Sequence, residues 1–245
     1  MPAATLIGVP ASHPTLAAEL MLRRKGVDYR RFDLVAGVHR PLLRLLGFSG
    51  ITVPALRLDD GVHIQGSRRL SRALDVLYPE RPLFPPDRRE EVERAEHWGD
   101  LVLQEVPRRI AWWGLRRRPT AVETFLVDAK TGIPQSLAAP LTGPVVILAG
   151  HLNRATDEAI ERDLATLPGL LDHVDRLIGD GVIGGDDPNA ADFQIAPSVR
   201  LLMSFADLRP AIESRPAGEF AVRVVPRFPG NVPPVLPAGS LAAPP

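Results

Sequence analysis

A proline-rich segment divides this 245-residue sequence into two halves of different character. Residues 79–87 hold four prolines in nine positions, a density that no regular helix or strand tolerates. Before this segment, short strand-like runs alternate with helical patterns, and after it helical patterns follow one another. We therefore expect an N-terminal α/β domain over 1–78, a linker over 79–87, a helical domain over 88–225 and a proline-rich tail over 226–245.

The N-terminal half is expected to fold in the order β-α-β-α-β-β-α. Alternating strands and helices are typical of an α/β layer. Asp59-Asp60-Gly61 predicts a tight turn, so the last two strands should form an antiparallel hairpin at the edge of the sheet. The expected strands are 5–9, 29–34, 53–58 and 62–65, and the expected helices are 15–25, 39–46 and 67–77.

The second half carries helical patterns over 88–117, 120–129, 140–152, 156–178 and 189–205. Pro107 lies inside the first of these and should kink or interrupt that helix. The tail contains seven prolines and two glycines, so it should form neither a helix nor a regular ladder. It either straps across the surface through Phe228, Val232, Val235 and Leu236 or is disordered.

Composition excludes several classes of function. The chain has no cysteine, so disulfides, thiolate metal sites and cysteine nucleophiles are excluded, and any thiol must come from a ligand. Twenty-nine basic residues balance 29 acidic ones, so the chain has no overall positive charge that would attract nucleic acid. The histidines lack metal-ligand spacing, so no metal site is expected. No segment is typical of a signal peptide or a membrane span, and we expect a cytoplasmic protein without a membrane partner.

Three local features carry the functional interpretation. Ser12 stands where the first strand meets the first helix, so its hydroxyl can cap that helix or donate to a bound thiolate. Pro54 opens the third strand, where an X–Pro bond can be cis or the proline can serve as an ordinary turn residue. Gln65-Gly66-Ser67 ends a strand and opens a helix, and the N–H groups there suit a carboxylate, although Ser67 can also be only a cap.

Taken in order, these features resemble the N-terminal domain of the glutathione transferase superfamily, in particular its serine-type classes. The resemblance also includes Lys25-Gly26 at a helix end and Asn189-Ala190-Ala191-Asp192, which matches the family's structural capping box. It spans about residues 4–210 and implies a thioredoxin-like α/β domain followed by an all-α domain. It further implies no permanently bound cofactor, a glutathione or other low-molecular-weight thiol as co-substrate, and a homodimer.

The resemblance also implies roles for individual residues. Ser12 would be catalytic and would stabilise the thiolate. The thiol-binding residues would be His39, Arg40, Val53, Pro54, Gln65, Gly66 and Ser67. The pocket for an apolar co-substrate would involve Pro10, Ala11, His13, Arg109, Trp112 and Trp113, although both tryptophans can also be core residues.

The sequence departs from the family at two places. Gly66 stands where the family usually has Glu or Gln, and the first helix starts with His13, Pro14, Ala17 and Ala18 in place of the family's additional serines and arginine. We expect an enzyme that conjugates a thiol to a small apolar electrophile. The alternatives are a non-catalytic module that binds ligands or proteins, and a thiol-dependent dehalogenase, isomerase or reductase on the same fold.

Overall fold

A four-stranded mixed sheet forms the base of the N-terminal half in the computed structural model, which describes residues 4–131, 142–237 and 241. Its strands are β1 (Ala4–Gly8), β2 (Tyr29–Asp33), β3 (Ala55–Leu58) and β4 (His63–Gln65), in the order β2-β1-β3-β4. β1 and β2 run parallel, whereas β3 is antiparallel to both β1 and β4. The expected α/β layer with an antiparallel edge hairpin is therefore confirmed. β3 begins after Pro54, since proline has no N–H to give to a ladder.

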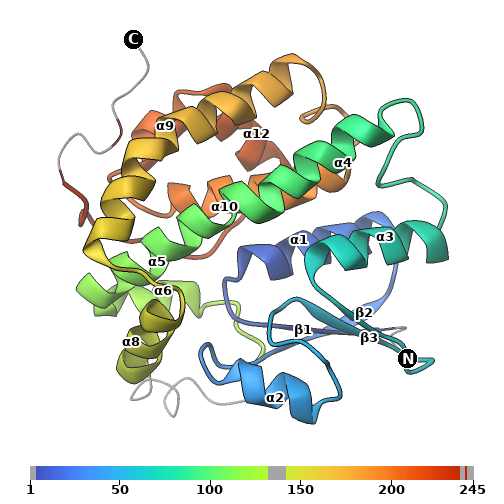
Figure 1. Cartoon of the computed structure of the whole chain (residues 1–245), viewed down its shortest axis with the longest axis horizontal. Helices are drawn as coiled ribbons and strands as arrows, with labels where there is room; N and C mark the ends of the chain where they lie inside the picture. Colours follow the sequence, from blue (N-terminus) through green and yellow to red (C-terminus); the bar gives the residue numbers. More distant parts are fainter. Residues whose placement is uncertain (1–3, 132–141, 238–240, 242–245) are drawn as a thin grey trace.

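Helices cover both faces of this sheet. α1 (His13–Arg24) and α3 (Ser67–Leu77) lie between the sheet and the helical half, and α2 (His39–Leu45) lies on the opposite face, as Figure 1 shows. Leu6 and Leu56 of the sheet are completely buried in one hydrophobic cluster with residues of α1 and α3. This packing holds the start of α1 at the carboxyl end of β1.

The helical half packs around one buried helix. Every residue of α10 (Ala190–Met203) except Arg200 is buried, and the helix contacts α1 of the N-terminal half. Asn189 and Asp192 form the expected capping box at its start, so each satisfies the other's backbone N–H. The remaining helices are α4 (Arg89–Trp98), α5 (Glu105–Arg117), α6 (Val122–Phe125), α8 (Thr142–Leu152), α9 (Asp157–Gly179), α11 (Arg209–Glu213) and α12 (Pro216–Val224).

The long helical pattern over 88–117 is interrupted before its proline. A π-helical turn, Gly99–Leu103, separates α4 from α5, and Pro107 follows four residues after that turn. Pro107 cannot donate to the carbonyl of Leu103, so the irregularity lies where the missing hydrogen bond would fall. A Cβ on Gly99 would stand 2.9 Å from Ile195, so the glycine lets this turn approach α10 closely.

One segment differs from the expected pattern, and the tail follows one of its two expected alternatives. The helix expected over 120–129 is reduced to a 3₁₀ turn, Pro119–Ala121, and the short α6. The tail straps across the helical half up to residue 237: the backbone of Val232 pairs with Ser204 and Ala206 at 2.8 and 3.0 Å. Residues 238–240 and 242–245 of the expected tail, and the first two of the helix expected over 140–152, lie outside the described residues. None of the described helices has both the length and the apolar character needed to cross a membrane.

Candidate functional site

Ser12 occupies the turn between β1 and α1. Its Oγ accepts a hydrogen bond from the backbone N–H of Thr15 at 3.3 Å, which makes it the N-cap of α1. The preceding Ala11 has a φ of 54°, so the chain turns sharply before the helix begins. The Ser12 hydroxyl therefore lies at the positive end of the helix dipole and keeps its own proton for a further acceptor.

Val53 and Pro54 lie beside this turn. Ala55 pairs with Ile7 of β1, which places the two preceding residues next to the carboxyl end of β1. The Val53–Pro54 peptide bond is cis. Within the described residues, neither the N–H nor the C=O of Val53 has a backbone partner, whereas the carbonyl of Pro54 accepts from the N–H of Gly66 at 2.9 Å. The Val53 backbone is thus available to pair with an extended ligand.

Gln65, Gly66 and Ser67 join β4 to α3 at the same edge. The side-chain amide of Gln65 bonds to the loop before Pro54: its Oε1 accepts from Gly50 N–H at 2.8 Å and its Nε2 donates to Thr52 O at 2.7 Å. Gly66 has a φ of 90° and provides no side-chain cap. Ser67 is 3% exposed, and its hydroxyl makes no hydrogen bond to any described residue. The first N–H groups of α3 and this hydroxyl can therefore bind an anion.

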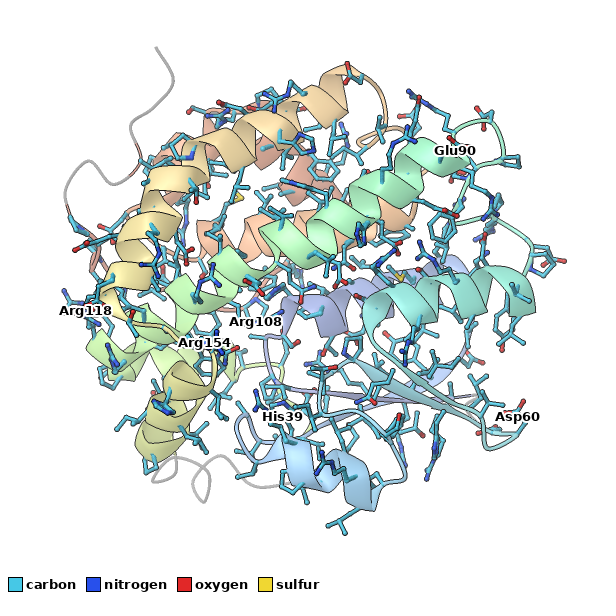
Figure 2. All side chains as sticks on the ribbon, viewed as in Figure 1. His39, Asp60, Glu90, Arg108, Arg118 and Arg154 are labelled. Carbon is cyan, nitrogen blue, oxygen red and sulfur yellow. The ribbon has the colours of Figure 1, made fainter. Side chains whose placement is uncertain are left out.

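His39 and Arg40 open α2, on the other face of the sheet. Figure 2 shows His39 at the first turn of this helix. Its Nδ1 is buried without a partner in the described part of the chain. Burial, and then the charge of Arg40, lower the pKa of His39. Among the described residues, no hydrogen bond or ion pair joins either residue to the edge formed by Ser12, Val53 and Ser67, so their thiol-binding role stays a prediction.

His13 points into the interface with the helical half. It is 4% exposed, and its Nε2 is buried without a hydrogen-bond partner among the described residues. Burial, and then the charge of Arg108, lower the pKa of His13 well below its ordinary value. Arg108 of α5 donates to Gln104 and has no carboxylate within ion-pair distance in the described ranges. Figure 2 shows Arg108 on the side of α5 that faces the start of α1. Arg108 was not among the residues predicted from the sequence, where its only signal was the i, i+4 spacing to Gln104.

The other residues of the expected co-substrate pocket divide into two groups. Pro10 and Ala11 belong to the turn that precedes Ser12, and both are partly exposed. Arg109 instead makes two 2.7 Å bonds to Asp163 of α9 and one of 2.8 Å to Glu105. Trp113 donates to Asp157 at 2.7 Å, and Trp112 packs partly buried against the core. The structure thus brings Pro10, Ala11 and His13 close to Ser12 along the chain and ties Arg109 and Trp113 to α9.

A cavity of about 320 Å³ opens beside Ser12. Ala11, Ser12 and Leu16 of the α1 segment form one wall, and the strap residues Arg227 and Phe228 form another. Lys130, which follows α6, also lines it. The sequence did not reveal these last three residues as neighbours of Ser12, because no local pattern shows that segments so distant along the chain meet.

Comparisons with known proteins agree with this architecture. Residues 6–82 match the family described as "Glutathione S-transferase, N-terminal domain". No curated protein matches the chain in sequence. Among solved structures, a glutathione S-transferase from Rhodospirillum rubrum F11 is similar at 20% identity and a TM-score of 0.62, with 91% of this chain and 88% of that chain covered.

Two further solved structures are similar over most of the chain. A GST-like protein from Pseudomonas syringae shares 18% identity at a TM-score of 0.59, with 95% of this chain and 70% of that chain covered. A glutathione S-transferase from Ceriporiopsis subvermispora in complex with glutathione shares 18% identity at a TM-score of 0.59, with 91% of this chain and 95% of that chain covered. At such identities the likeness concerns the fold. Residues 6–82 therefore match the N-terminal domain of the glutathione S-transferases, and the chain as a whole has the fold of the glutathione S-transferases to which it is similar.

Proposed function

We propose that this protein binds glutathione, or another low-molecular-weight thiol, and conjugates it to a small electrophile. The observation that carries the proposal is the meeting of three features at one edge of the sheet. These are the Ser12 hydroxyl at the start of α1, the Val53 backbone, and the Ser67 hydroxyl at the start of α3. Within the described residues, the Val53 backbone is unpaired and the Ser67 hydroxyl makes no hydrogen bond. A γ-glutamyl tripeptide offers a matching carboxylate, peptide backbone and thiol.

In this proposal, Ser12 activates the thiol by stabilising its anion. A free thiol has a pKa of about 8.5, and each unit of depression needs about 1.4 kcal/mol of preferential stabilisation of the thiolate. One hydroxyl donor at a helix N-terminus can supply roughly one to two units. The thiolate sulfur then bonds to the electrophilic carbon, whose leaving group departs with its electron pair, and the thiol proton passes to solvent.

The remaining thiol contacts follow from the same edge. The Val53 backbone would pair with the cysteinyl unit, and the start of α3 with Ser67 would hold the γ-glutamyl carboxylate. Gly66 offers no side chain to this carboxylate, and the Gln65 amide is already bonded to the loop before Pro54. His39 or Arg40 would hold the glycyl carboxylate only if the ligand reaches the start of α2.

Titration of bound thiol in Ser12→Ala tests the mechanism, and Thr156→Ala is its matched control. Thr156 caps α9 as Ser12 caps α1, because its side chain accepts from the N–H of Ala159 at 3.2 Å. Each substitution should therefore cost about 1 kcal/mol of stability through loss of a cap. Only Ser12→Ala should raise the pKa of the bound thiol, by about one to two units in the ultraviolet absorbance of the thiolate. If the wild type and Ser12→Ala titrate alike, Ser12 does not activate the thiol.

A non-catalytic binding module is the second candidate. It is favoured by Gly66 and by the internally bonded Gln65, because both remove side-chain contacts from the γ-glutamyl end of the ligand. Calorimetry with millimolar glutathione separates the two candidates when it is combined with an assay for conjugation. Binding of glutathione without turnover of any electrophile favours the non-catalytic module. Absence of glutathione binding excludes the proposal that the protein is a glutathione transferase.

Reactions other than conjugation would use the same thiol. A dehalogenase or isomerase needs only the activated thiol, whereas a reductase would have to form its disulfide between two ligand thiols, since the chain has no cysteine. We further propose that the protein acts in the cytoplasm as a homodimer, with neither a nucleic acid nor a membrane as partner. Sedimentation equilibrium tests the dimer directly.

A further inference from the structure

The cavity beside Ser12 has an apolar side that comes from three distant segments. Leu16 belongs to α1, Phe125 ends α6, and Phe228 and Pro229 belong to the strap. Gly230 keeps the strap close, because a Cβ there would stand 2.3 Å from the Phe125 ring. The N–H of Asn231 also donates to Thr124 at 2.8 Å. The strap therefore forms a fixed wall of the cavity.

Two of the four cations that line the cavity are already neutralised. Arg31 pairs with Asp33 at 2.9 Å and with Glu19 at 3.2 Å. Glu19 in turn accepts from the hydroxyl of Tyr29 at 3.0 Å and lies 3.7 Å from Arg23. Two arginines and two carboxylates thus balance each other along α1 and β2.

The other two cations, Lys130 and Arg227, have no such partners. Neither side chain makes a hydrogen bond or an ion pair within the described ranges, and Asp128, which also lines the cavity, is not within ion-pair distance of either. The backbone of Lys130 is nonetheless fixed: its N–H donates to the Asp33 carboxylate at 2.9 Å, and its carbonyl accepts from the Asp33 N–H at 3.0 Å. Among the described residues, two unpaired cations and the single unpaired carboxylate of Asp128 therefore line a cavity whose other side is apolar, so positive charge is in excess there.

We propose that this cavity is the electrophile site, and that it selects an aromatic electrophile bearing a carboxylate. The ring would lie between Leu16, Phe125 and Phe228, and the carboxylate would bind Lys130 and Arg227. The reacting carbon would then lie toward Ser12, which lines the same cavity. The inference rests on the proposed function for its chemistry, but the ligand class follows from the cavity itself.

Binding of 4-nitrobenzoate and of the neutral, similarly shaped 4-nitrobenzamide tests the ligand class without any thiol chemistry. Calorimetry should show the benzoate binding about tenfold tighter than the amide to the wild type. Lys130→Met and Arg227→Met should each reduce this ratio about threefold, as expected for charge pairs formed by exposed cations. Arg57→Met is the control, since Arg57 is an exposed cation of β3 without an ion pair among the described residues, and it should leave the ratio unchanged.

A turnover assay then links the cavity to the reaction. Glutathione is offered with 4-chloro-3-nitrobenzoate or with 4-chloro-3-nitrobenzamide, so that a C–S bond forms and chloride leaves. A higher kcat/KM for the benzoate that falls in Lys130→Met and Arg227→Met supports the proposal. Equal binding of benzoate and amide, or a preference that survives both substitutions, overturns it. Turnover of neither compound, with the binding preference intact, contradicts only the proposed conjugation.

Discussion

Gln65 holds the loop that presents Val53. Its amide uses both of its polar atoms, one as acceptor for the N–H of Gly50 and one as donor to the carbonyl of Thr52. A Cβ on Gly50 would stand 2.5 Å from Gln65 Oε1, so the loop and the amide fit closely. Under the proposed function, Gln65 would therefore act on a bound thiol only through the loop that leads to Val53.

We predict that Gln65→Leu weakens thiol binding without removing any atom that touches the thiol. The substitution leaves the Gly50 N–H and the Thr52 carbonyl without their partner, which should cost about 1–2 kcal/mol in urea unfolding. Loosening of the loop should raise the Kd for glutathione about three- to tenfold and leave the pKa of the bound thiol unchanged. Gln104→Leu, a comparable loss of a side-chain amide outside this loop, is the control. A shift in the thiol pKa of Gln65→Leu would instead indicate direct contact.

How far single residues could be predicted depends on the sequence separation of their partners. Ser12 and Asn189 bond within three residues, so their capping roles were visible in local patterns. The partners of Gln65 lie 13 and 15 residues away, and the Asp163 partner of Arg109 lies 54 residues away. A polar side chain near a predicted site can bond equally well to a ligand or to a distant segment, and the sequence does not show which.

Among the elements, the position of α5 depends on a missing side chain. Gly114 faces Phe205, and a Cβ there would stand 2.4 Å from the ring. Gly169 lies inside α9, where an added Cβ would meet no neighbouring side chain within 4 Å. A glycine-to-alanine substitution therefore meets an aromatic ring in α5 and open space in α9.

We predict opposite effects for Gly114→Ala and Gly169→Ala. Overpacking against Phe205 should cost about 1–3 kcal/mol in Gly114→Ala. Gly169→Ala should stabilise the protein by about 0.5–1 kcal/mol, because alanine loses less backbone entropy in a helix. Urea unfolding of both variants beside the wild type measures the difference. Equal changes in the two variants would show that α5 can shift away from Phe205.

The capping box of α10 should make stability depend on pH. Burial raises the pKa of Asp192 to about 6, although the N–H groups of Asn189 and Gly184 counteract it. Between about pH 4 and pH 6 the folded state therefore holds a proton that the unfolded state has lost, so the stability falls as the pH rises through this window. The effect is at most about 3 kcal/mol.

We predict that Asp192→Asn flattens this dependence. The amide cannot ionise, so the stability difference between wild type and variant should be larger near pH 4 than near neutral pH. Asp207→Asn serves as the control, since Asp207 also accepts from two backbone N–H groups, those of Val235 and Leu236, at 2.7 and 3.0 Å. A parallel pH dependence in the wild type and Asp192→Asn would contradict the raised pKa.

The element boundaries that the sequence misplaced are set by tertiary contacts. The local pattern favoured a helix over 120–129, but the chain after α6 leaves the helical half to reach β2. There the N–H of Lys130 donates to the Asp33 carboxylate, and the carbonyl of Lys130 accepts from the Asp33 N–H. Those bonds replace the helical ones and build one rim of the cavity. The spacing of apolar residues identified most of the long helices, because it marks the buried face of a helix. A segment that crosses between layers has no repeated apolar spacing, so the sequence does not reveal it.

At the scale of the whole molecule, one buried carboxylate joins the two halves. Glu96 of α4 is completely buried, and side chains of α3 of the N-terminal half contact its carboxylate. Ser71 donates to it at 2.6 Å and Arg72 at 2.5 Å, and Arg68 lies 3.7 Å away. Arg72 also lies over the ring of Phe84 in the proline-rich segment, 4.9 Å from its centroid. Glu96 thus satisfies polar groups of α3 that would otherwise face an apolar interface.

We predict that Glu96→Ala uncouples the unfolding of the two halves. Loss of the carboxylate leaves Ser71 and Arg72 with only the carbonyl of Arg68 as a main-chain acceptor, which should cost about 2–4 kcal/mol. All three tryptophans lie on α4 and α5, so their fluorescence follows the helical half, whereas circular dichroism follows both halves. In the wild type, the two urea transitions should coincide. In Glu96→Ala they should separate, because the N-terminal half has lost its buried hydrogen bonds to α4 and keeps, among the described residues, only the longer pair of Asp75 with Arg89, at 3.7 Å. Glu93→Ala removes only an exposed pair with Arg89 on the same helix, so it should change stability by less than about 0.5 kcal/mol and leave the transitions together. Coincident transitions in Glu96→Ala would mean that the apolar contacts of α1 with α10 hold the halves together without this carboxylate.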